Sequence, residues 1–242
     1  MQHTSRTDDP ALSWELLSRV QTPGERDVFE AMYDLYEASF PEDSERESKE
    51  KWERVLRAAE QQTYVLEFMV ARMGSEVVGG AAYEYYPMSE CGLLTFLFVR
   101  SAYRGRGIAR GLVARVHRRL TSEKPLRILF AEVEDPVLVE ANGIETSIDP
   151  HLRLRILAQL GAKAVDIHYV QPALEPHKKP AEHLMLLAMV HETMNTIDRR
   201  TLEAFLNEFY ASLGVETDAA SVLLEHAFAN TTGERVSLAP LV

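Results

Sequence analysis

The sequence contains one cysteine, Cys91, among 242 residues, which excludes an internal disulfide framework. A single thiol is typical of proteins that work in a reducing compartment, so we predict a cytoplasmic location. No apolar run approaches the roughly 20 residues that a membrane-spanning helix needs. The first ten residues, MQHTSRTDDP, lack the apolar core of a signal peptide. We therefore predict no association with a membrane.

Several common ligand-binding patterns are also missing. The eight histidines show no recognised metal-ligand spacing, so we predict no metal site. No G-K-[ST] sequence is present, which excludes a Walker loop. Gly105 and Gly107 begin a G-x-G pattern, but Arg110 stands where a Rossmann loop needs its third glycine. The two commonest nucleotide-binding loops are thus excluded.

The charge of the chain is unevenly distributed. The net charge is −11, which makes the chain a poor general binder of nucleic acid, and we predict no such partner. Between Arg100 and Arg127, however, nine basic residues face one acidic residue, Glu123. A local basic segment suits a small ligand that carries several phosphates. The alternative is an ordinary solvated helix face.

That basic segment lies in the most informative stretch of the sequence. The apolar run Leu93–Val99 predicts a buried strand, and apolar residues at helical spacing predict a helix over 108–120. Between them stands Arg104-Gly105-Arg106-Gly107. A turn that leads from a strand into a helix aims backbone N–H groups at the positive helix end, and glycines let an anion approach closely. The stretch therefore predicts an anion-binding turn.

The pattern [RQ]-x-x-G-x-[GA] is met here by Arg104, Gly107 and Ala109. In its strand–turn–helix setting it resembles the acyl-CoA pyrophosphate loop of the GNAT N-acetyltransferase superfamily. The resemblance implies acetyl-CoA, or another short acyl-CoA, as acyl donor. It implies that the turn holds the pyrophosphate and that the end of the strand lends backbone groups to the pantetheine. The implied binding residues are Leu97, Phe98, Val99, Arg104, Gly105, Arg106, Gly107, Ile108 and Ala109.

The order of the expected elements also matches that family. Residues 1–190 predict a mixed α/β domain with the GNAT fold, in which the strand before the loop diverges from the strand after its helix. Residues 191–242 predict a mainly helical extension, packed on this domain or on a partner subunit, which leaves a homodimer open. The expected strands are Ser13–Val20, Thr63–Arg72, Glu76–Tyr86, Leu93–Val99, Leu126–Val133, Ala164–Val170, His183–Val190 and Glu234–Leu241. An irregular loop is expected over Asp135–Thr146.

Acyl transfer to an amine needs a base that keeps the amine neutral. Glu132 stands near the end of the strand Leu126–Val133, and some GNAT enzymes carry a general-base glutamate in a similar Leu-Glu-Val segment. Glu134 is the rival, because alternation along a strand places it on the same face. For either carboxylate, the alternative is a structural ion pair. We predict Glu132 as the base.

The sequence departs from the family pattern at the expected proton donor. GNAT enzymes commonly carry a tyrosine four residues before the glycine that ends the last helix, where it protonates the departing thiolate. Leu157 occupies that position here, four residues before Gly161, and leucine cannot donate a proton. Tyr169 and His168 are the nearest substitutes in the sequence. Water, or departure of the thiolate without help, are the alternatives.

These observations predict transfer of an acetyl or other short acyl group from acyl-CoA to a primary amine by direct attack. The alternative is a non-catalytic acyl-CoA-binding module with a regulatory or structural role. Transfer of a longer acyl chain is a third possibility, because the loop recognises only the phosphates. The acceptor, a small-molecule or peptide amine, is not identified by the sequence.

Overall fold

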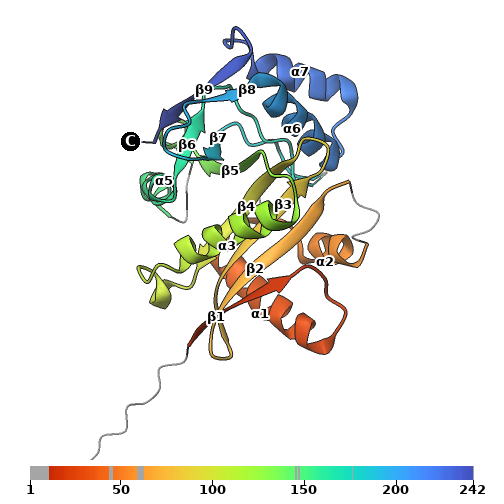
Figure 1. Ribbon diagram of the computed structural model, residues 1–242, viewed down its shortest axis with the longest axis vertical. Coiled ribbons are helices and arrows are strands. Elements are labelled where there is room, and N and C mark those ends of the chain that lie inside the picture. Colours follow the sequence, from red (N-terminus) through yellow and green to blue (C-terminus); the bar gives the residue numbers. More distant parts are fainter. Residues whose placement is uncertain are drawn as a thin grey trace, which may run out of the picture.

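The computed structural model describes residues 11–43, 46–58, 63–144, 146, 148–175 and 177–241. Within these ranges the chain forms one nine-stranded mixed sheet in the order β1-β2-β3-β4-β5-β7-β6-β9-β8 (Figure 1). The strands are β1 Leu12–Leu17, β2 Val65–Met73, β3 Glu76–Tyr86, β4 Cys91–Val99, β5 Ile128–Glu134, β6 Ala162–Val165, β7 Leu184–Met189, β8 Thr196–Asp198 and β9 Arg235–Pro240. The α-helices are α1 Pro23–Ser39, α2 Lys49–Arg57, α3 Ile108–Glu123, α4 Pro136–Asn142, α5 Pro150–Gln159, α6 Arg199–Ser212 and α7 Thr217–Ala227.

Helices cover both faces of this sheet, and each face has its own apolar core. Residues of α1, α2, α6 and α7 pack on one face, and residues of α3 and α5 pack on the other (Figure 1). Strand β5 shows the alternation, because Phe130 belongs to the first core while Leu129 and Ala131 belong to the second. Glu132 therefore points to the face that carries α1, α2 and α6.

The sheet opens between its two parallel strands. Strands β4 and β5 pair from Cys91 with Ile128 to Leu94 with Ala131, and the pairing ends there. At the same level β4 is irregular against β3, since Tyr83 pairs with Leu94 and Ala82 with Phe96, so that Thr95 is passed over. A bulge of this kind bends a strand and increases its twist. The divergence that the resemblance implied is thus present, and it begins at Thr95.

Two expectations for secondary structure are wrong. The segment Asp135–Thr146 was expected to be an irregular loop, but it contains α4, which the Asp135 side chain caps and Gly143 ends with a φ of 62°. Asp-Pro at the start and glycine at the end are helix signals that outweigh the shortness of the segment. The strand expected over Ala164–Val170 ends at Val165, because the Asp166 amide bonds to Ser237 and the chain turns out of the sheet.

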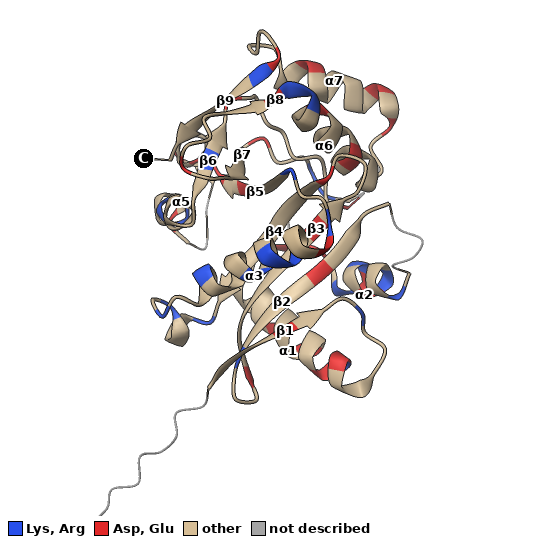
Figure 2. Ribbon diagram, in the orientation of Figure 1, with Lys and Arg blue, Asp and Glu red and all other residues tan. Residues whose placement is uncertain are grey.

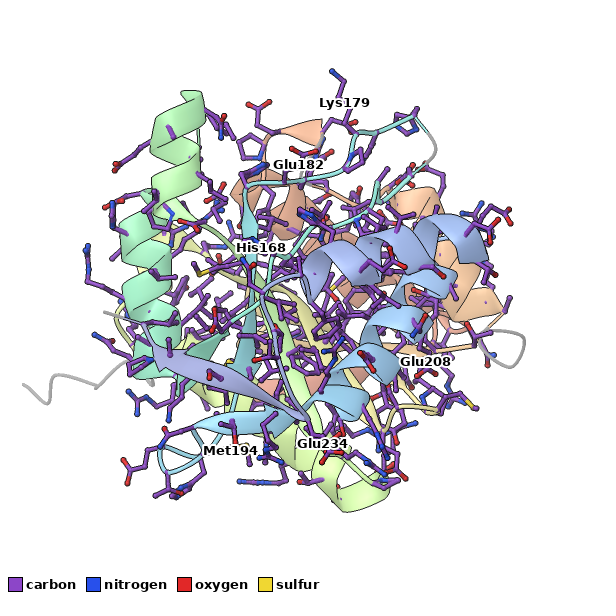
Figure 3. The ribbon with its side chains drawn as sticks, turned by 90° about the horizontal axis from the view of Figure 1, so that it is seen from above. His168, Lys179, Glu182, Met194, Glu208 and Glu234 are labelled. Atoms are coloured by element: carbon purple, nitrogen blue, oxygen red, sulfur yellow. The ribbon has the colours of Figure 1, made fainter. Side chains whose placement is uncertain are left out.

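The C-terminal extension joins the same sheet. Strand β9 pairs with β6, and β8 pairs with β9. Helix α6 covers β3 and β5, where the Phe205 ring lies 4.4 Å from Phe130 and 5.5 Å from Tyr86. Glu208 of α6, labelled in Figure 3, accepts hydrogen bonds from the backbone amide and hydroxyl of Ser89, each at 2.9 Å. The extension thus covers part of the sheet face to which Glu132 points.

Gly80 shows how closely the first core is packed. A Cβ atom added there would lie 2.5 Å from Cζ of Phe98, whose ring is buried against Tyr36. We expect Gly80→Ala to lower the free energy of unfolding by about 1–3 kcal/mol, the usual cost of overpacking, as measured by urea denaturation. Gly24→Ala is the control, because nothing lies within 4 Å of its added Cβ. Equal stability of the two variants would contradict this packing.

Candidate active site

A first cleft of about 500 Å³ lies between the diverging end of β4, the turn before α3, and α5. The turn and the strand end that were predicted to bind acyl-CoA form one side of it. Helix α5 forms the opposite side with Leu152, Ile156 and Leu157. Of the predicted binding residues, the cleft is lined by Leu97, Phe98, Val99, Arg104, Gly105, Gly107, Ile108 and Ala109. Arg106 is not among its lining residues.

The turn has the geometry of an anion site. Gly105 and Gly107 have φ angles of 74° and 78°, and a Cβ built on either residue would meet no atom within 4 Å. Gly107 is the N-cap of α3, and no side chain caps the N–H groups of the first turn. Helix α3 has 16 residues, so its dipole adds positive potential at this end. The donors fit a pyrophosphate group.

Basic residues occur in the turn before α3 and along this helix (Figure 2). Arg110 lines the cleft, and the Arg104 Nε donates to the Val99 carbonyl oxygen at 3.0 Å. The Arg106 guanidinium lies 5.2 Å from the Tyr103 ring centroid. Farther along the helix, Arg119 forms an ion pair with Glu67 at 2.8 Å and serves packing between α3 and β2. The basic residues near the turn favour an anion at this end of the cleft, whereas Arg119 is engaged in packing.

A second cleft of about 620 Å³ adjoins the first. It lies between the segment that follows α1 and the irregular connection from β6 to β7. The two clefts share lining residues where β4 and β5 separate. The shared residues are Phe40, Thr95, Phe96, Glu132, Val133 and Arg153. The clefts therefore meet beside the Glu132 carboxylate.

Glu132 is held at this junction by two neutral donors. The Tyr169 hydroxyl donates to one carboxylate oxygen, and the Gln171 amide donates to the other at 2.8 Å. Burial raises the pKa of Glu132 from its ordinary value to about 7, although the two hydrogen bonds act in the opposite direction. A carboxylate with this pKa can both accept and release a proton near neutral pH.

Glu134, the rival carboxylate, has a different environment. It is buried and forms an ion pair with Arg153 of α5 at 2.8 Å. Both side chains line the second cleft, and Arg153 also lines the first. A carboxylate that is paired with a guanidinium is a weak proton acceptor, because the neighbouring positive charge favours its ionised form. The ion pair connects α5 to the end of β5.

The candidates for proton donor are placed as follows. Leu157 lines the first cleft. Tyr169 is buried and its hydroxyl points to Glu132, while its ring lines neither cleft. His168 is exposed, with its Nε2 atom 2.6 Å from the Asn230 amide nitrogen. Burial and the nearby Glu132 raise the pKa of Tyr169 well above its ordinary value. Tyr169 thus orients Glu132 instead of facing the cleft.

Sequence reasoning missed three residues of the junction. Gln171 lies in a Pro-rich connection, 39 positions after Glu132, and no local pattern marks it. Phe40 stands at the end of an apolar stripe at helical spacing that begins at Val28, a pattern that predicts packing and marks no site. Thr95 gave no signal, although its hydroxyl is buried and has no hydrogen-bond partner within the ranges that the structure describes. These residues meet only through the fold.

The Cys91 thiol lacks the properties of a catalytic nucleophile. Cys91 is buried, and burial raises the pKa of its thiol to about 11, so it is a poor nucleophile. The described residues contain no cluster of three or more histidine, cysteine, aspartate or glutamate side chains that could hold a metal ion. In the same part of the chain, every helix is too short or too polar to cross a membrane.

A sheet that opens between two parallel strands, beside an uncapped helix N-terminus, is the architecture of acyl-CoA-dependent N-acyltransferases. Residues 29–141 match the model of the acetyltransferase (GNAT) family. This part of the chain therefore matches a GNAT acetyltransferase domain, and the mixed α/β fold of the chain is the GNAT fold. Acetyl-CoA is the acyl donor that this family uses.

Solved structures share this fold. A protein described as a GNAT-family acetyltransferase from Bacteroides thetaiotaomicron superposes with a TM-score of 0.59 at 14% identity, over 85% of this chain and 99% of that one. A tandem GNAT protein from the clavulanic acid biosynthesis pathway superposes with a TM-score of 0.51 at 20% identity. That match covers 66% of this chain and 46% of the tandem protein. No curated protein matches the sequence at a significant level.

Proposed function

We propose that the protein transfers an acetyl or other short acyl group from acyl-CoA to a primary amine by direct attack. The observation that carries the proposal is the meeting of the two clefts at Glu132, where β4 and β5 separate. One cleft ends at an anion site and suits the donor. The other is lined by different elements, leads to the same carboxylate and suits the acceptor.

The donor occupies the first cleft in this proposal. Backbone N–H groups at the start of α3 bind the pyrophosphate, with Gly105 and Gly107 allowing its approach. Backbone groups of Leu97–Val99 on the side away from β3, beyond the part of β4 that pairs with β5, bind the pantetheine. The thioester then lies at the junction, near Thr95 and Glu132.

The reaction forms a C–N bond and breaks a C–S bond. An amine with a pKa near ~10, the lysine reference value, arrives mostly protonated at neutral pH. Glu132 accepts that proton, directly or through a water molecule, while Tyr169 and Gln171 hold its two oxygens. The neutral amine attacks the thioester carbonyl carbon, and coenzyme A leaves as a thiolate as the C–S bond breaks. The attacking nitrogen then gives up its second proton, which passes through water to the thiolate and leaves a neutral amide. We assign no side-chain acid to this departure, since a thiol pKa near ~8.5 makes the thiolate a good leaving group.

A non-catalytic acyl-CoA-binding module is the second candidate, and Leu157 in the first cleft favours it, because leucine donates no proton. The two candidates differ in turnover. We expect thiol release from acetyl-CoA to depend on added amine, with the acetylated amine detected by mass spectrometry. Tight binding of coenzyme A without acetylation of any amine would favour the non-catalytic role.

The remaining assignments stay predictions. These are the division into a domain over residues 1–190 and an extension over 191–242, a homodimer, and a cytoplasmic location. The close packing of α6 on Phe130 supports an extension that folds together with the domain.

A further inference from the structure

The second cleft has apolar residues next to Glu132, although the ion pair of Glu134 with Arg153 also lines the cleft. Its exposed rim consists of Glu42, Asp43, His177, Lys179 and Pro180. Phe96, Val133 and Leu174 are buried, and Phe40 is half-buried with its ring 5.3 Å from that of Phe96. An acceptor that reaches Glu132 must therefore place the part next to its amine against aromatic and aliphatic groups.

Four of the charged residues that line this cleft form two ion pairs, Glu134 with Arg153 and Asp43 with Lys178. The Lys178 Nζ donates to the backbone carbonyl oxygens of Asp43, at 2.8 Å, and of Arg46, and it lies 3.9 Å from the Asp43 carboxylate. A second cation that entered the cleft would have to displace Arg153 or Lys178 from these pairs, and an anionic group would have to displace Glu134 or Asp43.

The outermost charges give no preference for a polycation either. Glu42 and Lys179 are both exposed lining residues and have opposite signs. Lys179 points outward from the connection between β6 and β7 (Figure 3). Glu132 differs from these residues, because the hydrogen-bond donors to it that the structure shows are uncharged. Among the carboxylates inside the rim, Glu132 is thus the one placed to receive an ammonium group, because Glu134 is already paired with Arg153.

We propose that the acceptor is a small monoamine whose single ammonium group is attached to an apolar or aromatic body. Polyamines and amines that carry an anionic group are poor acceptors. This proposal rests on the proposed function, because it assumes that the second cleft admits the acceptor. It adds the substrate class: the ammonium group goes to Glu132, and the body goes to the wall that Phe40 and Phe96 form.

The test uses the full chain with acetyl-CoA and three amines: 2-phenylethylamine, spermidine and L-glutamate. We expect kcat/KM for 2-phenylethylamine to exceed the other two by about 10- to 100-fold, the scale of burying one apolar group. An equal or higher kcat/KM for spermidine or L-glutamate would contradict the proposed substrate class, while the proposed acetylation of an amine would still hold. Calorimetric titration of each amine into coenzyme A-saturated protein separates binding from turnover. If 2-phenylethylamine binds more tightly than the other two amines but is not acetylated, the proposed reaction is wrong, while the proposed class of ligand is right.

A charge placed in the wall tests the location of the acceptor. Ile144 is half-buried and lines the second cleft, whereas Val137 is exposed and lines neither cleft. We expect Ile144→Glu to lower kcat/KM for 2-phenylethylamine about tenfold and to improve use of spermidine. Val137→Glu adds the same charge nearby and should change neither value. Pro180→Glu, at the exposed rim, replaces Ile144→Glu if that variant does not fold. If the ratio of kcat/KM for 2-phenylethylamine to kcat/KM for spermidine is the same in the cleft variants as in the wild type, the proposed acceptor site is wrong.

Discussion

Glu132→Gln is expected to lower the rate of acyl transfer by about 10²–10⁴, the scale of general acid–base catalysis, with the affinity for coenzyme A unchanged. Glutamine keeps the size of the side chain and removes its basicity. The pKa of Glu132 is raised to about 7, so the wild-type rate should increase with pH through about 7 as the carboxylate loses its proton. The variant should lack this acidic limb. The measurement is the pH dependence of kcat/KM from 5.5 to 9.

Stability supplies an independent readout of the same group. Because folding raises the pKa of Glu132, the folded state binds its proton more tightly than the unfolded state, and the contribution of this residue to stability falls as pH rises from about 4.5 to above 7. Glu132→Gln should remove this decline from the pH dependence of urea denaturation. The matched control is Glu134→Gln, two residues along β5, which should keep the acidic limb. Loss of the limb in Glu134→Gln, with normal turnover in Glu132→Gln, would identify Glu134 as the base.

Gly107→Glu is expected to weaken the binding of coenzyme A by about 100-fold or more. The substitution places a carboxylate at the helix N-terminus, where it repels the pyrophosphate and competes for the N–H groups at the start of α3. Two lost charge-assisted hydrogen bonds, at about 1.5–3 kcal/mol each, account for an effect of this size. Isothermal titration calorimetry with coenzyme A measures it.

The control for Gly107→Glu must carry the same backbone strain. Gly214 has a φ of 75°, nothing lies within 4 Å of its added Cβ, and it stands after α6, outside both clefts. Gly214→Glu and Gly107→Glu should therefore lose similar stability, about 1–2 kcal/mol for a left-handed residue. Only Gly107→Glu should lose affinity. Normal affinity in a folded Gly107→Glu variant would show that the phosphates bind elsewhere.

The part of the site that sequence could predict is local in the chain. The turn Arg104–Ala109 joins a strand to a helix, so glycine positions and apolar periodicity within 30 residues describe it completely. The end of β5 is a similar case, because alternation already places Glu132 and Glu134 on one face. The fold class followed from the same local patterns, taken in order along the chain.

The environment of Glu132 could not be predicted in this way. Tyr169 and Gln171 lie 37 and 39 positions away, in a segment that was expected to be partly a strand and is irregular. Their approach depends on where β6 ends and on the hydrogen bonds between Gln171 and Ala181. Phe205 reaches Phe130 from the extension, across 75 residues of sequence. Such contacts come from the completed sheet, which no window of the sequence contains.

The most direct measurement is a crystal structure of the protein with acetyl-CoA. We expect the pyrophosphate to contact the backbone N–H groups at the start of α3 and the pantetheine to lie along Leu97–Val99. The thioester carbonyl carbon should lie beside Thr95, within reach of one water molecule bound to Glu132. A pyrophosphate bound away from Gly107, or a thioester on the opposite face of β5 from Glu132, would contradict the proposed site.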